Sequence, residues 1–397
     1  MGNRVAAGLI VAAAATLVVT AGPAGAGAMV VSTEAELRAA FDTESSIVLA
    51  NDIELSDCIG GGAVTRSANA PVNLEGAGFT ITQTCVDNIF EPDQSDVTLQ
   101  NVTLTGGREP DDGGAIDMNG GNLTMIESAL VGNCAADSAG AIENEDGDTT
   151  IIRSTLAGND ADDQGGAVRS KRGNTLIVNS TVTENTQAQL GAVDSGQMDA
   201  VDASLTLVYS TIVANANDAS VDCDVGVLSE ADTDTDGDVG AAQVNPANVN
   251  AVDTFASFGT VVALPSGGPN CDIGTPGSEG YNYADDGSCG FTDPTDVENG
   301  SDPLLGGLAA NGGPTQTRLP QAGSPLIDAI PVANCADGDA FAGEAITTDQ
   351  RNLPRPASDG RGCEIGSVEL QPPLPPTVPP AEIPPPVPLA ATARFTG

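Results

Sequence analysis

The sequence contains no histidine, no tryptophan and a single lysine, Lys171, among 397 residues. Because histidine is the commonest general base and metal ligand, any catalysis would have to rest on carboxylates, arginine or Lys171. Aromatic residues make up only 3% of the chain. The core must therefore be filled by Val, Ile, Leu and Ala, and few rings remain to serve as a platform for sugars.

Basic residues are also scarce, with 13 Lys and Arg against 55 Asp and Glu and a net charge of −42. Binding to phosphate groups needs clustered Lys and Arg, so we expect neither a nucleic-acid partner nor an anionic lipid surface. A charge of this size favours solubility and divalent cations as counterions.

Residues 1–28 have the pattern of a secretory signal peptide. Arg4 is followed by an apolar run over residues 5–21, and the small residues "AGPAGAGA" offer A-x-A cleavage at 24–26 or 26–28. The alternative is an uncleaved membrane anchor. No later segment could span a membrane, so we expect an extracellular protein, secreted or cell-surface associated, without a transmembrane segment once the signal is removed. In that environment the eight cysteines indicate disulfides.

Two signatures recur within residues 57–223 at a common spacing of 25 or 26 residues over most of their length. One is a glycine before Ala, and the other is a Ser followed by an Asn further on. The recurring residues are Gly114, Gly140, Gly166 and Gly191; Ser128, Ser154, Ser180 and Ser210; and Asn133, Asn159, Asn185 and Asn215. Because independent markers keep one step, we interpret them as a true repeat.

Short apolar runs between these markers form three columns. Each run is rich in β-branched residues and too short for a helix. The columns are Ile116, Ile142, Val168 and Val193; Met125, Ile151, Ile177 and Leu207; and Leu130, Leu156, Val182 and Ile212. They predict an all-β solenoid whose coils stack at about 4.8 Å, with the Asn column forming a ladder of side-chain amides. A leucine-rich repeat is rejected, because Ser stands where that motif needs Leu and no helix follows within the period.

Residues 29–56 hold the one good helix signal, followed by the first strands. Thr33 and Glu36 form a capping box, and Leu37, Ala40 and Phe41 share one face. Such a helix would cover the open first coil. With these features, residues 29–223 resemble a right-handed parallel β-helix of the pectin-lyase type.

Residues 224–270 are expected to form an acidic, irregular insertion, after which residues 271–370 have a different texture. That segment carries "NGGPT" from Asn311, "GSP" from Gly323, "DQR" from Asp349 and "CEIG" from Cys363. These motifs resemble the terminal block of bacterial choice-of-anchor Q proteins, although Gln321 and Ala322 lengthen one run and "EIGSVE" departs from the usual pattern. The resemblance implies a secreted β-helix protein held at the cell surface, and the family has no single assigned activity.

From composition alone, the same block is expected to close the last coil. Asp349 or Asp328 would pair with Arg351 or Arg355, and a catalytic role for Asp328, Asp349 and Arg351 is the disfavoured alternative. Residues 371–397 begin as a semi-rigid polyproline spacer, without a recognised anchor after it.

Three disulfides are predicted from spacing: Cys58–Cys85, Cys271–Cys289 and Cys335–Cys363. Cys134 and Cys223 are about three coils apart along the axis, and that separation of about 14 Å is too long for a direct bridge.

The strongest metal signal is the stretch from Asp232 to Gln243. Asp232, Asp234 and Asp236 match the start of an EF-hand-like loop, and Asp238 would add a carbonyl ligand. Gln243 stands where the bidentate Glu belongs, so a solvated acidic loop is the alternative to a Ca²⁺ site.

Three further charged sets follow from the repeat. Asp111, Asp137 and Asp163 would stack at one corner, where we expect hydrated, exposed turns. Asp117, Glu143, Arg169 and Asp194 would form a charge ladder, weak because it is exposed. Arg169, Lys171 and Arg172 form the only basic cluster, and we expect no acid set beside it that could hold a lyase metal.

Two functions remain, since fold alone does not choose between them. We favour a secreted or cell-surface protein with a structural, adhesive or carbohydrate-contacting role and no catalytic site, with extracellular polysaccharide or cell-surface components as partners. The alternative is a polysaccharide lyase or glycoside hydrolase that acts along the β-helix flank.

Overall fold

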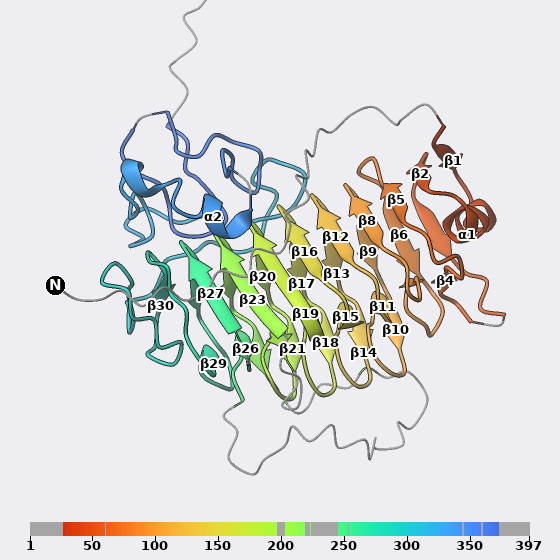
Figure 1. The fold of residues 1–397 in the computed structure, drawn as a ribbon, viewed down its shortest axis with the longest axis horizontal. Coiled ribbons are helices and arrows are strands. Elements are labelled where there is room, and N and C mark those ends of the chain that lie inside the picture. The colour runs from red at the N-terminus through yellow and green to blue at the C-terminus, as the bar shows by residue number, and fades with distance from the viewer. Residues whose placement is uncertain are drawn as a thin grey trace, which may run out of the picture.

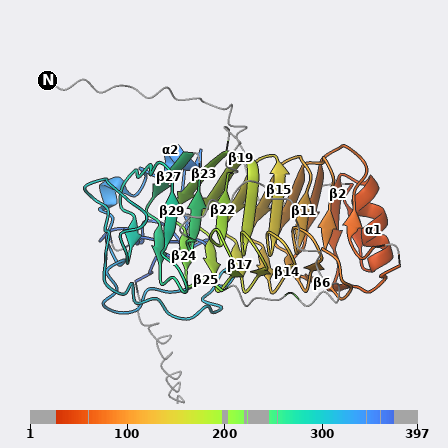
Figure 2. The same ribbon diagram turned by 90° about the horizontal axis from the view of Figure 1, so that it is seen from below.

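The protein forms a right-handed parallel β-helix, in which each coil of chain lies on the one before it (Figures 1 and 2). The structure is a computed structural model and describes residues 27–59, 61–196, 203–218, 223, 245–252, 254–343, 345–358 and 360–372. All pairings between its named strands are parallel, and they place Ile116 beside Ile142 and Leu130 beside Leu156 on consecutive coils. The predicted fold class is confirmed.

The strands line up in four stacks. Sheet A contains β1 (Met29–Val31), β2 (Ser46–Leu49), β5 (Val72–Glu75), β8 (Val97–Gln100), β12 (Leu123–Ile126), β16 (Thr149–Ile152), β23 (Ala203–Val208) and β27 (Thr254–Phe258). Sheet B contains β3 (Ile53–Leu55), β6 (Thr80–Gln83), β9 (Thr103–Thr105), β13 (Ala129–Val131), β17 (Thr155–Ala157), β20 (Thr181–Thr183), β24 (Thr211–Val213), β28 (Val261–Ala263) and β30 (Tyr283–Ala284). Sheet C contains β4 (Val64–Thr65), β7 (Phe90–Glu91), β11 (Ile116–Met118), β15 (Ile142–Asp146), β22 (Val193–Ser195), β26 (Val249–Ala251) and β29 (Cys271–Ile273). Sheet D contains β10 (Arg108–Glu109), β14 (Cys134–Ala135), β18 (Asp160–Ala161), β21 (Thr186–Gln187) and β25 (Ala216–Asn217), while β19 (Val168–Val178) runs from sheet C into sheet A.

The three predicted apolar columns are in register and form the core. Ile142 pairs with Ile116 and Val168, Ile151 with Met125 and Ile177, and all are fully buried. Stacking identical positions gives each side chain similar neighbours above and below, so aliphatic residues alone can fill a narrow core.

The Asn column forms the predicted amide ladder. Asn133 donates its side-chain N–H to Oδ1 of Asn159, which donates to Asn185 in turn, at 3.0 and 2.9 Å. The ladder continues through Asn215 to Asn248 and Asn270, two coils beyond the repeat recognised in the sequence. Most amides of the ladder also donate to a backbone carbonyl at the corner. The Asn159 side chain, for example, donates to Leu130 O.

Aromatic pairs close both ends of the core. Helix α1 (Glu34–Thr43) buries Leu37, Ala40 and Phe41 over the first coil, and Phe41 stacks on Phe90 with ring centroids 4.6 Å apart. Thr33 accepts from the Glu36 N–H as predicted, whereas the Glu36 carboxylate accepts from Ser32, one residue before the expected partner. At the other end, Phe291 stacks on Phe255 at 6.3 Å.

We expected residues 271–370 to close the last coil, and Phe291 of that segment does pack at this end of the core. Residues 303–372, called the C-terminal block from here on, instead lie along the side of the β-helix (Figure 1). The block contains two short helices, η1 (Val332–Asn334) and α2 (Asp339–Ala342). The outward faces of β19, β23 and β27 explain this position. Val178, Val208 and Phe258 form an apolar column there, and the block covers it with residues that include Leu326, Ile330 and Ile365.

The disulfides pair all eight cysteines. The three predicted bridges, Cys58–Cys85, Cys271–Cys289 and Cys335–Cys363, are confirmed. The prediction that Cys134 and Cys223 are too far apart was wrong, because they form the fourth bridge with a Cα–Cα distance of 5.8 Å. Cys223 does not stay at the level of β25: its sulfur lies 3.0 Å from Ala135 O and its N–H donates to Asp162. This pairing of all eight cysteines fits an extracellular protein.

Strands β26, β27 and β28 lie within residues 224–270, where we expected an irregular insertion, and they continue the solenoid. The predicted signal peptide before residue 27, the candidate calcium loop with Asp232, Asp234, Asp236 and Asp238, and the proline-rich tail after residue 372 lie outside the described residues. No helix in the described part of the chain has the length and apolar character needed to cross a membrane.

Candidate functional site: a charged flank on sheet C

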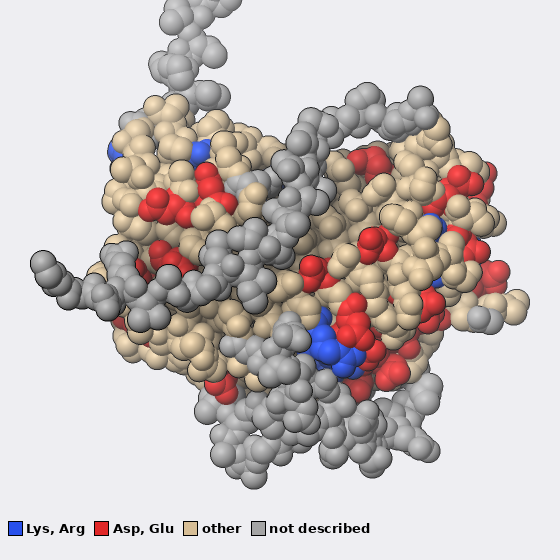
Figure 3. Space-filling view, viewed as in Figure 1, with Lys and Arg blue, Asp and Glu red and all other residues tan. Residues whose placement is uncertain are grey.

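A cluster of seven charged residues lies on the outer side of sheet C and at the turn beside it. We call it the charged flank, and it comprises Asp112, Asp117, Glu143, Glu145, Arg169, Lys171 and Asp194. On the face drawn in Figure 3, Lys and Arg gather in contact with acidic residues near the middle of the β-helix. The cluster is therefore the natural place to look for chemistry.

Strand register brings the ladder residues together as predicted. Asp117 pairs with Glu143, Glu143 with Arg169, and Arg169 with Asp194 on consecutive coils. The expectation that this ladder is exposed was wrong, since Glu143, Arg169 and Asp194 are 0, 4 and 1% exposed. Burial makes each charge costly unless it is compensated, so these contacts matter more than surface pairs do.

Lys171 is the centre of the charged flank. Its Nζ lies 3.1 Å from Glu145, 3.2 Å from Glu143 and 3.5 Å from Asp112. Burial alone would lower the pKa of Lys171, but the attraction of Glu143 and then of Asp112 outweighs it and raises the pKa above its ordinary value. A lyase base must be neutral to accept a proton, and Lys171 is instead held as a cation.

Two carboxyl groups of the flank are held toward their neutral form. Burial, and then repulsion by Asp112, raises the pKa of Glu143 to about 8. The same two causes raise the pKa of Asp117 to about 7. Apart from the ion contacts with Lys171 and Arg169, neither carboxyl oxygen of Glu143 has a hydrogen-bond partner among the described residues. Near neutral pH, the flank therefore offers protonated carboxyls beside fixed cations.

An acidic corner adjoins the flank. Asp111, Asp137 and Asp163 stack through their backbones as predicted, although only Asp111 is exposed and the other two are half-buried. Oxygens of Asp111, Asp112 and Asp137 lie within 4.8 Å of one another. Our expectation that no set of acids lies beside the basic cluster was wrong. Asp112 belongs to the acidic corner and also contacts Lys171. Carboxylate oxygens so arranged are of the kind that bind Ca²⁺.

The remaining predicted residues lie elsewhere. Arg172 pairs with exposed Asp146. In the C-terminal block, Asp349 pairs with Arg351 at 2.8 Å, as predicted, while Asp328 lies 3.6 Å from Arg361. Asp349 is fully buried and also accepts from the Glu369 N–H, which indicates a structural role.

Sequence reasoning missed Asp112, Glu145 and the contact of Asn250 with Asp194 at 2.7 Å. The contact of Glu145 with Lys171 could have been predicted, because Glu145 stands one period before Lys171 in the sequence. Asp112 is 59 residues from Lys171 and faces it only after two coils have formed.

A scan against protein-family models and searches among curated proteins and solved structures gave no match to this chain. The resemblance of the C-terminal block to choice-of-anchor Q proteins therefore stays a prediction.

Proposed function

We propose that the protein is an extracellular β-helix that contacts neutral polysaccharide through the charged flank. The observation that carries this proposal is the convergence of three carboxyl groups on Lys171 at the outer side of sheet C. Protonated and ionised carboxyls with a fixed ammonium can donate to and accept from sugar hydroxyls.

Charge favours a neutral ligand over a uronate polymer. The flank has five acids and two bases, and the whole chain carries a net charge of −42. An anionic polysaccharide would be repelled at long range, whereas a neutral one would not.

Binding to insoluble and soluble polysaccharides tests this proposal, with Lys171→Met as the informative variant. We expect the wild type to bind neutral polymers and Lys171→Met to bind them about fivefold or more weakly, since it loses the central donor. Arg172→Met is the matched control, because its exposed pair with Asp146 lies outside the flank. Equal binding by both variants, or binding only to polyuronates, would contradict the proposal.

Glycoside hydrolysis is a second candidate, favoured by one observation. Asp117 is half-buried, its pKa is raised to about 7, and it stands beside Glu143 on the next coil. A carboxyl in that state can donate a proton to a leaving oxygen at neutral pH. New reducing ends formed by the wild type and not by Asp117→Asn would support hydrolysis, and their absence on every neutral polymer would exclude it for those substrates.

A further inference from the structure

A groove of about 460 Å³ lies at the corner between sheets B and D, away from the charged flank. The chain turns there from β9 into β10, and likewise from β13 into β14. The Asn ladder lies beneath the corner. The lining of the groove includes Thr84, Cys85, Arg108, Gly132, Cys134 and Asp160.

Gly132 keeps part of the lining open because it has no side chain. Gly132 has φ +65°, and the matching residues of later coils, Glu184 and Ala214, keep φ of 60° and 58°. The backbone at this corner therefore accepts a side chain, and a Cβ at Gly132 would meet only Thr105 Oγ1 at 3.9 Å. The glycine at position 132 is therefore not required by the backbone conformation, and its effect is to leave the space of a side chain empty.

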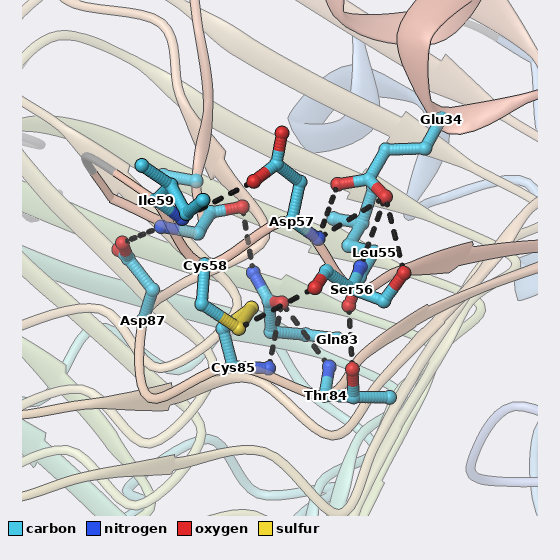
Figure 4. Close-up of a disulfide and its surroundings, with 12 residues drawn as sticks. Glu34, Leu55, Ser56, Asp57, Cys58, Ile59, Gln83, Thr84, Cys85 and Asp87 are labelled. Carbon is cyan, nitrogen blue, oxygen red and sulfur yellow. Dashed lines mark hydrogen bonds between the residues drawn. A yellow bond between two sulfur atoms is a disulfide. The ribbon is translucent and has the colours of Figure 1, made fainter.

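The walls are rigid before any ligand arrives. Cys85 and Cys134 line the groove, and each is held in a disulfide, to Cys58 and Cys223. Figure 4 shows the first of these bridges beside Gln83, whose side chain is fixed by hydrogen bonds to neighbouring backbone. A preformed groove loses little conformational freedom on binding, which favours affinity.

The polar groups of the groove suit an uncharged ligand with many hydroxyls. Arg108, Cys134 and Asp160 stand in one register column, so a guanidinium and a carboxyl lie one coil to either side of Cys134. Arg108 is exposed, and Asp160 is half-buried, which raises the pKa of its carboxyl. One basic and one acidic side chain leave the lining without a large charge of either sign.

The groove runs along the stacking direction, where equivalent backbone groups recur about every 4.8 Å. We propose that it binds one extended chain of a neutral linear polysaccharide, parallel to the axis of the β-helix. This would be a second binding site, distinct from the charged flank.

Isothermal titration calorimetry on the full chain tests the groove, with cello-hexaose, laminari-hexaose and manno-hexaose as probes. The informative variant is Gly132→Glu, which places in the groove the side chain that Glu184 carries at the same corner two coils later. Gly78→Glu is the control: its φ is +84°, a Cβ there would meet nothing within 4 Å, and it adds the same charge in the exposed turn between β5 and β6, outside the lining. Thermal melting of both variants checks that they fold.

We expect at least one hexasaccharide to bind, Gly132→Glu to weaken this binding about tenfold or more, and Gly78→Glu to leave it within about twofold. Repeating the titrations in the Lys171→Met background removes the contribution of the charged flank, and the difference between Gly132→Glu and its control should persist there. The proposal is overturned if no hexasaccharide binds at millimolar concentration, if both glycine variants lose affinity equally, or if Lys171→Met abolishes the binding.

Discussion

The side-chain oxygen of Asn159 accepts two hydrogen bonds from Asn133, one from the side-chain N–H at 3.0 Å and one from the backbone N–H at 3.1 Å. Both residues are fully buried. One amide thus binds Asn133 and Leu130 of the coil before it and Asn185 of the coil after it, so the ladder adds buried side-chain hydrogen bonds to the backbone pairing between coils.

Replacing Asn159 by Ala should lower the free energy of unfolding by about 3 kcal/mol, because several buried donors and acceptors lose their partner. Asn122→Ala is the control. Asn122 belongs to a second ladder with Asp96 and Asp148, but it is exposed, so water can replace its contacts at a cost below about 1 kcal/mol. Urea denaturation measures both values, and similar losses would contradict a special role for the buried ladder.

Stability should fall as pH rises from about 5 to 8. The folded pKa of Glu143 is about 8, above its ordinary value of 4.5, so the folded state keeps a proton that the unfolded state releases in this window. Glu109 and Glu364, whose pKa values are also raised to about 8, act in the same direction. Melting temperatures at several pH values should show the decline, and Glu143→Gln should reduce its slope.

The control for that experiment is Glu145→Gln, which removes another contact of Lys171 from a more exposed position. We expect its profile to follow that of the wild type. A Glu143→Gln profile as steep as that of the wild type would show that Glu143 is ionised in the folded protein.

Removing the Cys134–Cys223 bridge by substituting both residues with Ser should destabilise the protein by about 4 kcal/mol, since the bridge closes a long loop in the unfolded chain. The two residues are 89 positions apart, against 18 for Cys271 and Cys289. Non-reducing peptide mapping of the wild type should recover the linked Cys134 and Cys223 peptides. Two thiols that react with an alkylating reagent in the folded protein would disprove the bridge.

The C-terminal block should loosen when Gln350 is replaced by Ala. Gln350 is buried at the interface, where it donates to Ser154 O and Thr155 Oγ1 and accepts from Thr181 Oγ1. We expect a loss of about 2 to 3 kcal/mol from the orphaned groups and faster proteolysis within residues 303–372. Asn352→Gly, which loses one exposed contact with Glu127 and accepts the φ of 63° at this position, should be cleaved like the wild type. Equal cleavage of all three proteins would show that apolar contacts alone hold the block.

The features that follow the period could be predicted from the sequence. The columns of Ile142 and Ile151, the ladder through Asn159 and the Cys58–Cys85 bridge each join positions about one coil apart, so spacing alone identifies neighbours. Features that break the period could not be predicted in this way. Cys223 departs from the stacking order to reach Cys134, and the period does not show that Glu143 is fully buried.

The C-terminal block was misplaced for a related reason. The outward column of Val178, Val208 and Phe258 was visible in the sequence as apolar residues beside the core columns, and it indicates a covered face. Nothing in the spacing says that the cover comes from residues 303–372.

Attachment of the C-terminal block to the side of the rod makes the length of the rod free to evolve at one end. The block contacts the coils that carry Glu127, Arg153, Asn179 and Thr211, and its described hydrogen bonds reach no coil before these. Duplication of a whole unit ahead of β8 would extend the molecule and leave every one of these contacts in place, whereas the same duplication between Arg153 and Thr211 would shift half of them out of alignment.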